Sequence, residues 1–286
     1  MSYRIITDTC CDFPQKMYAK ENLSVVSLSV LYKGETVKSY SEKWLKKMFE
    51  GLRSGETAST SAANPQDWQE AIEPVLAGGE DALVLAFSSG LSTTYQSAVI
   101  AAQELKEKYP DRTINVVDTL CASLGQGLLV WYACKKRDAG FSLADLTAWC
   151  EENKHRTCHW FTVDDLMYLK RGGRVSAATA LVGTMLQIKP VLHVDKEGRL
   201  INVSKVRGRK ASIEALAKKM GELGTPGEND TVFICHGDCL EDAQLLASLI
   251  KERCGVKEVF IGYTGAVIGS HSGPGTLALF FLGSQR

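Results

Sequence analysis

Short apolar runs rich in β-branched residues alternate with longer segments of helical spacing along most of the chain. The apolar runs predict strands at 4–7, 23–31, 82–87, 114–117, 157–163, 190–194, 200–203, 232–235, 258–261 and 277–282. The segments between them predict helices at 42–52, 66–76, 95–108, 123–137, 143–153, 211–223 and 241–254. This alternation is typical of an α/β protein built around a mainly parallel sheet.

The pattern changes in the second half of the chain. Two short strands there flank Asp195-Lys196-Glu197-Gly198, which predicts a hairpin with Gly198 in the turn. Antiparallel pairing is therefore expected after about residue 154. We expect two α/β domains: residues 1–156 with a mainly parallel sheet and flanking helices, and residues 157–286 with a mixed sheet.

Composition and charge exclude several classes of protein. The chain has 286 residues, 45% of them hydrophobic, with 33 basic and 33 acidic side chains. It has no broad positive field, so capture of nucleic acid or of an anionic membrane is not expected as its main activity. No apolar run approaches the roughly 20 residues of a membrane span. The start, Met-Ser-Tyr-Arg, lacks the apolar region of a secretory signal, which predicts a cytoplasmic protein.

The nine cysteines form no regular framework and include no Cys-x-x-Cys pair. We expect reduced thiols that pack as small apolar groups. The nearest approach to a metal cluster, Cys235-His236-Gly237-Asp238-Cys239, lacks a second pair of ligands at suitable spacing. The sequence therefore predicts no metal and no cofactor.

Four loops combine small hydroxyl residues with glycine, proline or acidic residues near predicted strand ends, where open α/β sheets bind ligands. They are 7–14, 60–65, 88–95 and 269–276. In the third, hydroxyls and free backbone N–H groups at a helix start can bind an anion, although Ser92 or Thr93 could equally serve only as a helix cap. In the fourth, His271 lies among small residues and could donate a hydrogen bond, carry a proton or close a turn.

Two basic segments leave a similar choice open. Lys170-Arg171-Gly172-Gly173-Arg174 and Arg207-Gly208-Arg209-Lys210 could each bind a phosphate, and each could equally be a solvated basic segment such as an ordinary helix end. The standard nucleophile, zinc-protease and nucleotide motifs are absent from the sequence. Many hydroxyls without an identifiable general base favour recognition over catalysis.

Together these loops resemble the DegV family, whose members are fatty-acid-binding subunits that present a fatty acid to a separate bacterial fatty acid kinase. The resemblance runs nearly end to end. Its motifs are Thr7-Asp8-Thr9 with Asp12-Phe13-Pro14, Thr60-Ser61 with Pro65, Ser88-Ser89-Gly90-Leu91-Ser92 with Thr94-Tyr95-Gln96-Ser97-Ala98, Val117-Asp118-Thr119 with Ser123-Leu124-Gly125-Gln126-Gly127, Leu169-Lys170-Arg171-Gly172-Gly173-Arg174, Lys189-Pro190 and His271-Ser272-Gly273-Pro274-Gly275.

The resemblance implies a long-chain fatty acid in an apolar tunnel between two α/β domains, with no other cofactor. It assigns Thr60 and Ser92 as hydrogen-bond donors to the carboxylate, with Ser61 and the N–H of Thr93 close by and His271 completing the network. The family usually has glycine where this chain has Thr93. A positive φ at that position would be strained for threonine.

The resemblance also implies a partner, the fatty acid kinase, and a place in bacterial phospholipid metabolism. Arg171, Arg174 and Arg209 would face the phosphate donor bound to that kinase. Transient contact with a membrane surface is left open, and no nucleic acid is expected.

The expectation is thus a carrier that is not itself an enzyme. One rival is a transferase or hydrolase that uses the Ser/Thr loops and His271, with Asp8 or Asp118 in acid–base chemistry. Another is a regulatory or scaffold protein whose bound ligand is structural. A long closed apolar tunnel would favour the carrier, and an open polar cleft would favour the enzyme.

Overall fold

The structure is a computed structural model that describes residues 2–176 and 187–286. Its first sheet is parallel and four-stranded, in the order β2-β1-β6-β7. The strands are β1 (Tyr3–Asp8), β2 (Ser24–Val26), β6 (Asp81–Ala86) and β7 (Ile114–Asp118). Ile5 and Ile6 point to opposite faces of this sheet and both are fully buried, so both faces are covered.

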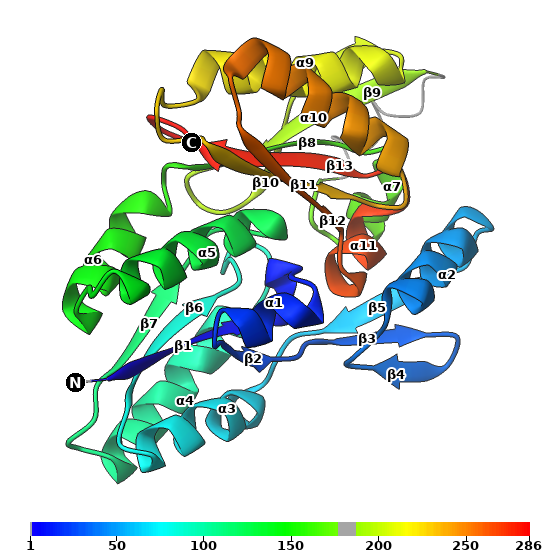
Figure 1. Cartoon of the computed structure of the whole chain (residues 1–286). Helices are drawn as coiled ribbons and strands as arrows, with labels where there is room; N and C mark the ends of the chain where they lie inside the picture. The colour runs from blue at the N-terminus through cyan, green and yellow to red at the C-terminus, as the bar shows by residue number, and fades with distance from the viewer. Residues whose placement is uncertain (1, 177–186) are drawn as a thin grey trace.

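Helices cover the two faces of this sheet in pairs (Figure 1). α3 (Pro65–Ala77) and α4 (Thr94–Lys108) pack together on one face, and α5 (Leu124–Asp138) and α6 (Leu143–Asn153) on the other. The remaining helices of this half are the short 3-10 helix η1 (Thr9–Cys11), α1 (Gln15–Lys20) and α2 (Glu42–Arg53). The start of α3 is fixed by a capping box between Asn64 and Asp67, as its sequence suggests.

A small antiparallel sheet in the first half was not expected from the sequence. Its order is β4-β3-β5, with β3 (Ser29–Tyr32), β4 (Glu35–Val37) and β5 (Ala58–Ser61). The single strand predicted at 23–31 is therefore wrong, because this stretch divides between β2 and β3, which belong to different sheets. Val26, Leu28 and Val30 are all buried in one core, so the apolar pattern continues through the change of sheet.

The second half of the chain forms a six-stranded mixed sheet in the order β10-β9-β8-β13-β11-β12. The strands are β8 (Thr157–Thr162), β9 (Ile188–Val194), β10 (Leu200–Arg207), β11 (Thr231–His236), β12 (Glu258–Tyr263) and β13 (Leu277–Leu282). The predicted hairpin joins β9 to β10, with Gly198 at φ +74°. The predicted α/β fold class is confirmed, and the domain boundary at residue 157 stays a prediction.

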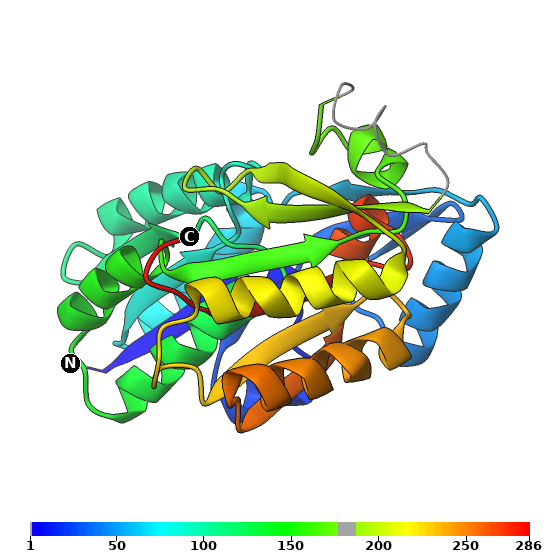
Figure 2. The same cartoon turned by 90° about the horizontal axis from the view of Figure 1, so that it is seen from above.

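The two faces of the six-stranded sheet have different neighbours. α9 (Arg209–Leu223) and α10 (Leu240–Cys254) lie side by side over one face (Figure 2). Trp160 on β8 and Leu279 on β13 point to that side. Phe161 and Phe280 alternate with them and face the first half of the chain. The short helices α7 (Met167–Arg171) and α11 (Ala266–Ser272) complete the junction.

The helices and the cysteines show two further general features of the chain. Among the described residues, no helix is long and apolar enough to cross a membrane. All nine cysteines are unpaired, and seven of them are buried. Burial raises the pKa of the Cys235 thiol to about 12, so it stays protonated at neutral pH.

Candidate functional site

An apolar cavity of about 530 Å³ lies between the carboxyl edge of the parallel sheet and the inner face of the six-stranded sheet. The loops that follow β6 and β7 contribute Leu91 and Ala122 to its wall. β8 and β13 contribute Phe161, Ala278 and Phe280 from the opposite side. The volume and the predominantly apolar lining are those of a pocket for a small organic molecule.

Thr60 and His271 form one polar part of this wall. Thr60 lies on β5 of the small sheet, and His271 lies in the last turn of α11. The distance between Thr60 Oγ1 and His271 Nε2 is 2.7 Å. The structure therefore brings together two of the predicted site residues, which are 211 positions apart in the chain.

Ser92 and Thr93 form a second polar part of the wall, just before α4. Ser92 Oγ accepts from Thr94 N–H at 3.2 Å and lies 2.8 Å from Thr94 Oγ1. Ser92 thus both closes the start of the helix and lines the cavity. Thr93 has φ −79° and ψ 3°, a conformation open to any residue, so the strain considered for threonine at this position does not arise.

Ser61 does not share this placement. It is exposed and lies outside the cavity wall. Successive residues of a strand point to opposite sides, so Thr60 and Ser61 on β5 cannot both face the cavity.

His271 is neutral at pH 7 in this setting. Burial and, to a smaller extent, the nearby Arg174 guanidinium lower the pKa of its imidazole to about 4. The ring packs against Gly172, where a Cβ atom would overlap Nδ1. Gly172 is thus required by close approach, in addition to lying at the end of α7.

The three predicted phosphate-facing arginines have different surroundings. Arg174 lines the cavity and donates from Nε at 3.1 Å and from Nη2 at 2.9 Å to the carbonyl of Leu91, and from Nη1 to the carbonyl of Gly172. Arg171 is exposed, with its guanidinium 5.3 Å from the ring centre of Tyr168.

Arg209 forms ion pairs with two aspartates of the second half of the chain. Its Nε lies 2.9 Å from Asp242 Oδ2, and its Nη1 lies 3.7 Å from Asp164 Oδ1. Of the three arginines, only Arg174 belongs to the cavity wall.

His159 also lines the cavity, although it lies outside the four loops that the sequence singled out. Its Nδ1–H donates to the carbonyl of Thr157 at 2.8 Å, and its Nε2 accepts from Ala122 N–H at 3.2 Å. Burial holds the pKa of the ring well below its usual value, so the ring is neutral. The only signal in the sequence was its alternation with Phe161 on a strand that is apolar on both faces.

A buried polar cluster closes the cavity near the start of α5. Ser123 Oγ donates to Asp12 and lies 3.2 Å from Cys235 Sγ, which also accepts from Thr264 Oγ1 at 3.2 Å. Ser123, Cys235 and Thr264 line the cavity, and Asp12 lies behind them. In the part of the chain that is described, no three His, Cys, Asp or Glu residues gather as a metal site requires.

The fold and the cavity together define an α/β protein with an apolar cavity between its two main sheets and polar groups in the cavity wall. The chain belongs to the DegV family: the model described as "Uncharacterised protein, DegV family" matches residues 2–284. The family predicted from the loop motifs is thereby confirmed.

Individual relatives match over nearly their whole lengths. A DegV domain-containing protein of Clostridium perfringens, CPE0026, is 44% identical over 284 residues, covering 99% of this chain and 98% of that protein. A solved structure described as fatty acid binding of a DegV family protein from Thermus thermophilus has 32% identity and a TM-score of 0.88, covering 99% of this chain and 100% of that one. A Thermotoga maritima protein, described as revealing a fatty acid binding function, has 28% identity and a TM-score of 0.84 over 99% of both chains.

Proposed function

We propose that this protein is a cytoplasmic carrier that holds a long-chain fatty acid in the cavity and presents its carboxylate to a fatty acid kinase, which converts it to an acyl phosphate for phospholipid metabolism. The observation that carries the proposal is an apolar cavity with Thr60, Ser92 and His271 in its wall, where Thr60 and His271 are in hydrogen-bond contact. The Thermus and Thermotoga relatives described as fatty-acid-binding support it.

The apolar wall supplies the affinity. Burial of an acyl chain gains about 0.8 kcal/mol for each CH₂ group, so a long chain binds tightly without strong polar contacts. The polar groups then need only to fix the position and direction of the carboxylate.

Neutral donors suit a carboxylate that must react. When the proton of His271 is on Nε2, the ring donates to Thr60 Oγ1, and the Thr60 hydroxyl is free to donate to the ligand. Ser92 O–H and Thr93 N–H add donors at the start of α4. Hydrogen bonds from neutral groups leave more electron density on the carboxylate than a tight ion pair would, which favours its attack on a phosphoryl donor.

The arginine nearest to this site is restrained. Arg174 uses three of its N–H groups on the carbonyls of Leu91 and Gly172. Exposed Arg171 is the predicted cation that a docking kinase can reach directly. Arg209 would first have to leave its contact with Asp242.

The geometry favours this carrier over a hydrolase or transferase. His271 pairs with the hydroxyl of Thr60, and within residues 2–176 and 187–286 no carboxylate is hydrogen-bonded to it. Asp8 accepts from Cys10 N–H at 2.9 Å and from Phe87 N–H at 2.8 Å, and Asp118 accepts from Ser89 N–H at 3.1 Å. Neither aspartate lines the cavity, so neither is placed to orient His271.

Native mass spectrometry of protein purified under mild conditions tests the ligand. We expect added masses that correspond to long-chain fatty acids and that disappear after delipidation. A protein that carries no such mass, and that fails to take up palmitate or oleate after delipidation, would contradict the proposal.

Phosphorylation by a fatty acid kinase tests the carboxylate site. Ser92→Ala and His271→Ala should retain the acyl chain but slow acyl phosphate formation by roughly tenfold or more, as expected for losing a hydrogen bond to a charged group. Ser61→Ala is the matched control, because Ser61 lies outside the wall, and it should react like the natural protein. Equal rates for all four proteins would exclude this carboxylate site.

A further inference from the structure

β12 is an edge strand of the six-stranded sheet. In residues 2–176 and 187–286, its only strand partner is β11, which pairs with it in parallel from Thr231↔Glu258 to His236↔Tyr263. The opposite edge of β12 is free of strand pairing in this part of the chain. Such an edge presents backbone N–H and C=O groups that can pair with another extended chain.

Two surface hollows lie beside β12, and each also contacts its neighbour β11. One of about 740 Å³ contacts Glu258, Val259 and Phe260. Another of about 550 Å³ contacts Phe260, Ile261, Gly262 and Tyr263. Together they touch every residue of the strand. They form a groove, called here the β12 groove, that is long enough for an extended peptide.

The β12 groove has an apolar floor and a helical wall. Trp131 and Phe233 lie at the bottom of the first hollow, and the rings of Trp131 and Phe233 are 5.8 Å apart. α1 forms the wall across from the strand, where Lys16 lines both hollows. Alternate side chains of an added strand would point down to this floor, as in other cases of strand addition.

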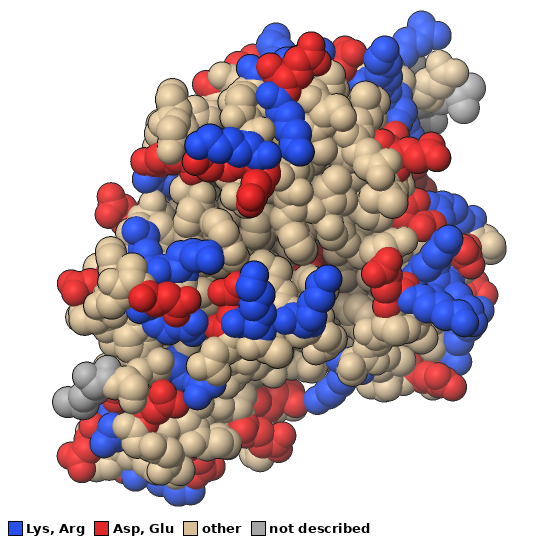
Figure 3. All heavy atoms as spheres, viewed as in Figure 1, with Lys and Arg blue, Asp and Glu red and all other residues tan. Residues whose placement is uncertain are grey.

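The rim of the first hollow of the β12 groove is basic. The first hollow is lined by five lysines and one acidic residue, Glu258. The lysines are Lys16, Lys20, Lys135, Lys251 and Lys257, and all five are exposed. Lys257 forms an ion pair with Asp230, in which Nζ lies 2.7 Å from Oδ2. The pair is exposed and therefore weak. Figure 3 shows blue side chains over the position of α1 in the middle of this face. The whole chain has no net charge, so this concentration of positive charge is local.

We propose that the β12 groove docks an acidic, extended segment of a partner protein, which adds a strand to β12. Backbone bonds to the free edge would give affinity, and alternate apolar side chains would fill the floor. Acidic side chains would meet the lysines, which gives charge complementarity and speeds association. The proposal is independent of the fatty-acid cavity, because none of the residues that line the first hollow lines that cavity.

A membrane surface fits the groove less well. Phe233 is 1% exposed and lies at the bottom of the hollow, where a flat bilayer cannot reach it. Lysines on an edge can also serve only to prevent strand pairing between copies of a protein. Binding to lipid vesicles and self-association of the variants therefore have to be measured together with peptide binding.

The test uses the full chain and a short fluorescein-labelled peptide that alternates glutamate with valine and phenylalanine. We expect binding, measured by fluorescence anisotropy, that weakens with added salt. The combined variant Lys16→Gln, Lys20→Gln and Lys135→Gln should bind about tenfold more weakly or worse. The matched control, Lys106→Gln, Lys196→Gln and Lys205→Gln, changes three exposed lysines outside the groove and should bind like the natural protein.

Hydrogen exchange distinguishes strand addition from simple charge attraction. Saturating peptide should slow exchange of the backbone amides in residues 258–263, and the same peptide with a central proline should bind weakly. Unchanged exchange there, or equal losses in both triple variants, would overturn the proposal. It would also be overturned by binding to phosphatidylglycerol vesicles without peptide binding, or by a groove variant that self-associates yet binds the peptide as before.

Discussion

Asp12 is a carboxyl group held in the interior of the protein. It is 7% exposed, and burial raises its pKa to about 7 although Ser123 donates a hydrogen bond to it. Nearby Asp8, whose pKa is raised to about 6, acts on Asp12 in the same direction. Asp12 therefore binds a proton in the folded protein at pH values where the unfolded chain has lost it.

Because of this difference, the free energy of unfolding should fall as the pH rises. The contribution of protonated Asp12 is present in full below about pH 4, the value for an unfolded aspartate, and is lost as the pH rises through about 7. The free energy of unfolding of the natural protein should fall relative to that of Asp12→Asn across this range, by up to about 1.4 kcal/mol per pH unit. Urea unfolding of both proteins across this range measures the difference. Parallel profiles would show that Asp12 is ionised throughout.

The β9–β10 hairpin reaches across the molecule to the loop that follows β6. The carbonyl of Gly198 accepts from Ser88 Oγ at 2.9 Å. Gly90 lies so close to the hairpin that a Cβ atom there would be 2.6 Å from the carbonyl oxygen of Glu197. Leu91, Val194 and Leu200, from these same two segments, line the cavity. This contact thus closes one side of the ligand site.

Gly198→Ala should open that contact. The added methyl group overlaps Ser88 Oγ, and φ +74° is unfavourable for alanine. We expect faster release of a bound fluorescent fatty acid, by roughly tenfold, because the wall loosens. Gly34→Ala is the control, since Gly34 has φ +80° in the β3–β4 turn with nothing within 4 Å. It should lower stability by about 1 kcal/mol without affecting release. Equal release rates would refute the role of the hairpin.

Elements with a regular apolar pattern were predictable from the sequence, and irregular ones were not. The strands of the parallel sheet and the long helices carry periodicity that reflects burial on one or both faces. β4 and β5 are short and largely exposed, so no such pattern marks them. The sequence predicts a loop at 269–276, because Gly269-Ser270-His271-Ser272 favours turns. In the structure these four residues belong to α11, whose packing against the core overrides that preference.

The residues of the candidate site could be predicted from the sequence only in part. Loops at strand ends pointed to Ser92 and His271, and the DegV resemblance paired them with Thr60. The alternation of His159 with Phe161 does not show which face of the strand meets the cavity, because the strand is buried on both sides. The cavity itself arises from the meeting of the two sheets, which is a tertiary property.

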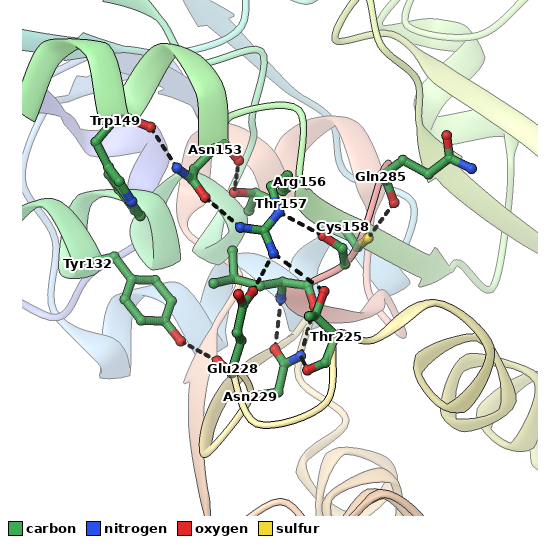
Figure 4. A network of polar contacts seen from close by, with 12 residues as sticks. Tyr132, Trp149, Asn153, Arg156, Thr157, Cys158, Thr225, Glu228, Asn229 and Gln285 are labelled. Atoms are coloured by element: carbon green, nitrogen blue, oxygen red, sulfur yellow. Dashed lines mark hydrogen bonds and ion pairs between the residues drawn. The ribbon is translucent and has the colours of Figure 1, made fainter.

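At the scale of the whole molecule, a polar network joins the end of α6 to the second half of the chain (Figure 4). Arg156 donates to Asn153 Oδ1 at 3.0 Å and to the carbonyl of Gly283 at 3.1 Å, and it pairs with Glu228. Tyr132 on α5 donates to the carbonyl of Glu228 at 3.0 Å. The network thus holds the two halves together where the chain passes from one to the other.

Arg156→Ala should lower stability by about 2 kcal/mol, because it leaves several partly buried acceptors without a charged donor. This corresponds to a fall of roughly 5 °C in the melting temperature by calorimetry. Arg199→Ala is the matched control, since its pair with Glu197 is 65% and 69% exposed and should contribute little. Similar melting temperatures for both variants would show that the network does not stabilise the junction.

The strand order of the six-stranded sheet has a consequence for biosynthesis. β13 lies between β8 and β11, yet the ribosome makes it after all the other strands of that sheet. Until β13 has emerged, the nascent sheet is split in two and the side of the cavity that carries Ala278 and Phe280 does not exist. The first half can fold during translation, but ligand loading must wait until translation of this region is complete.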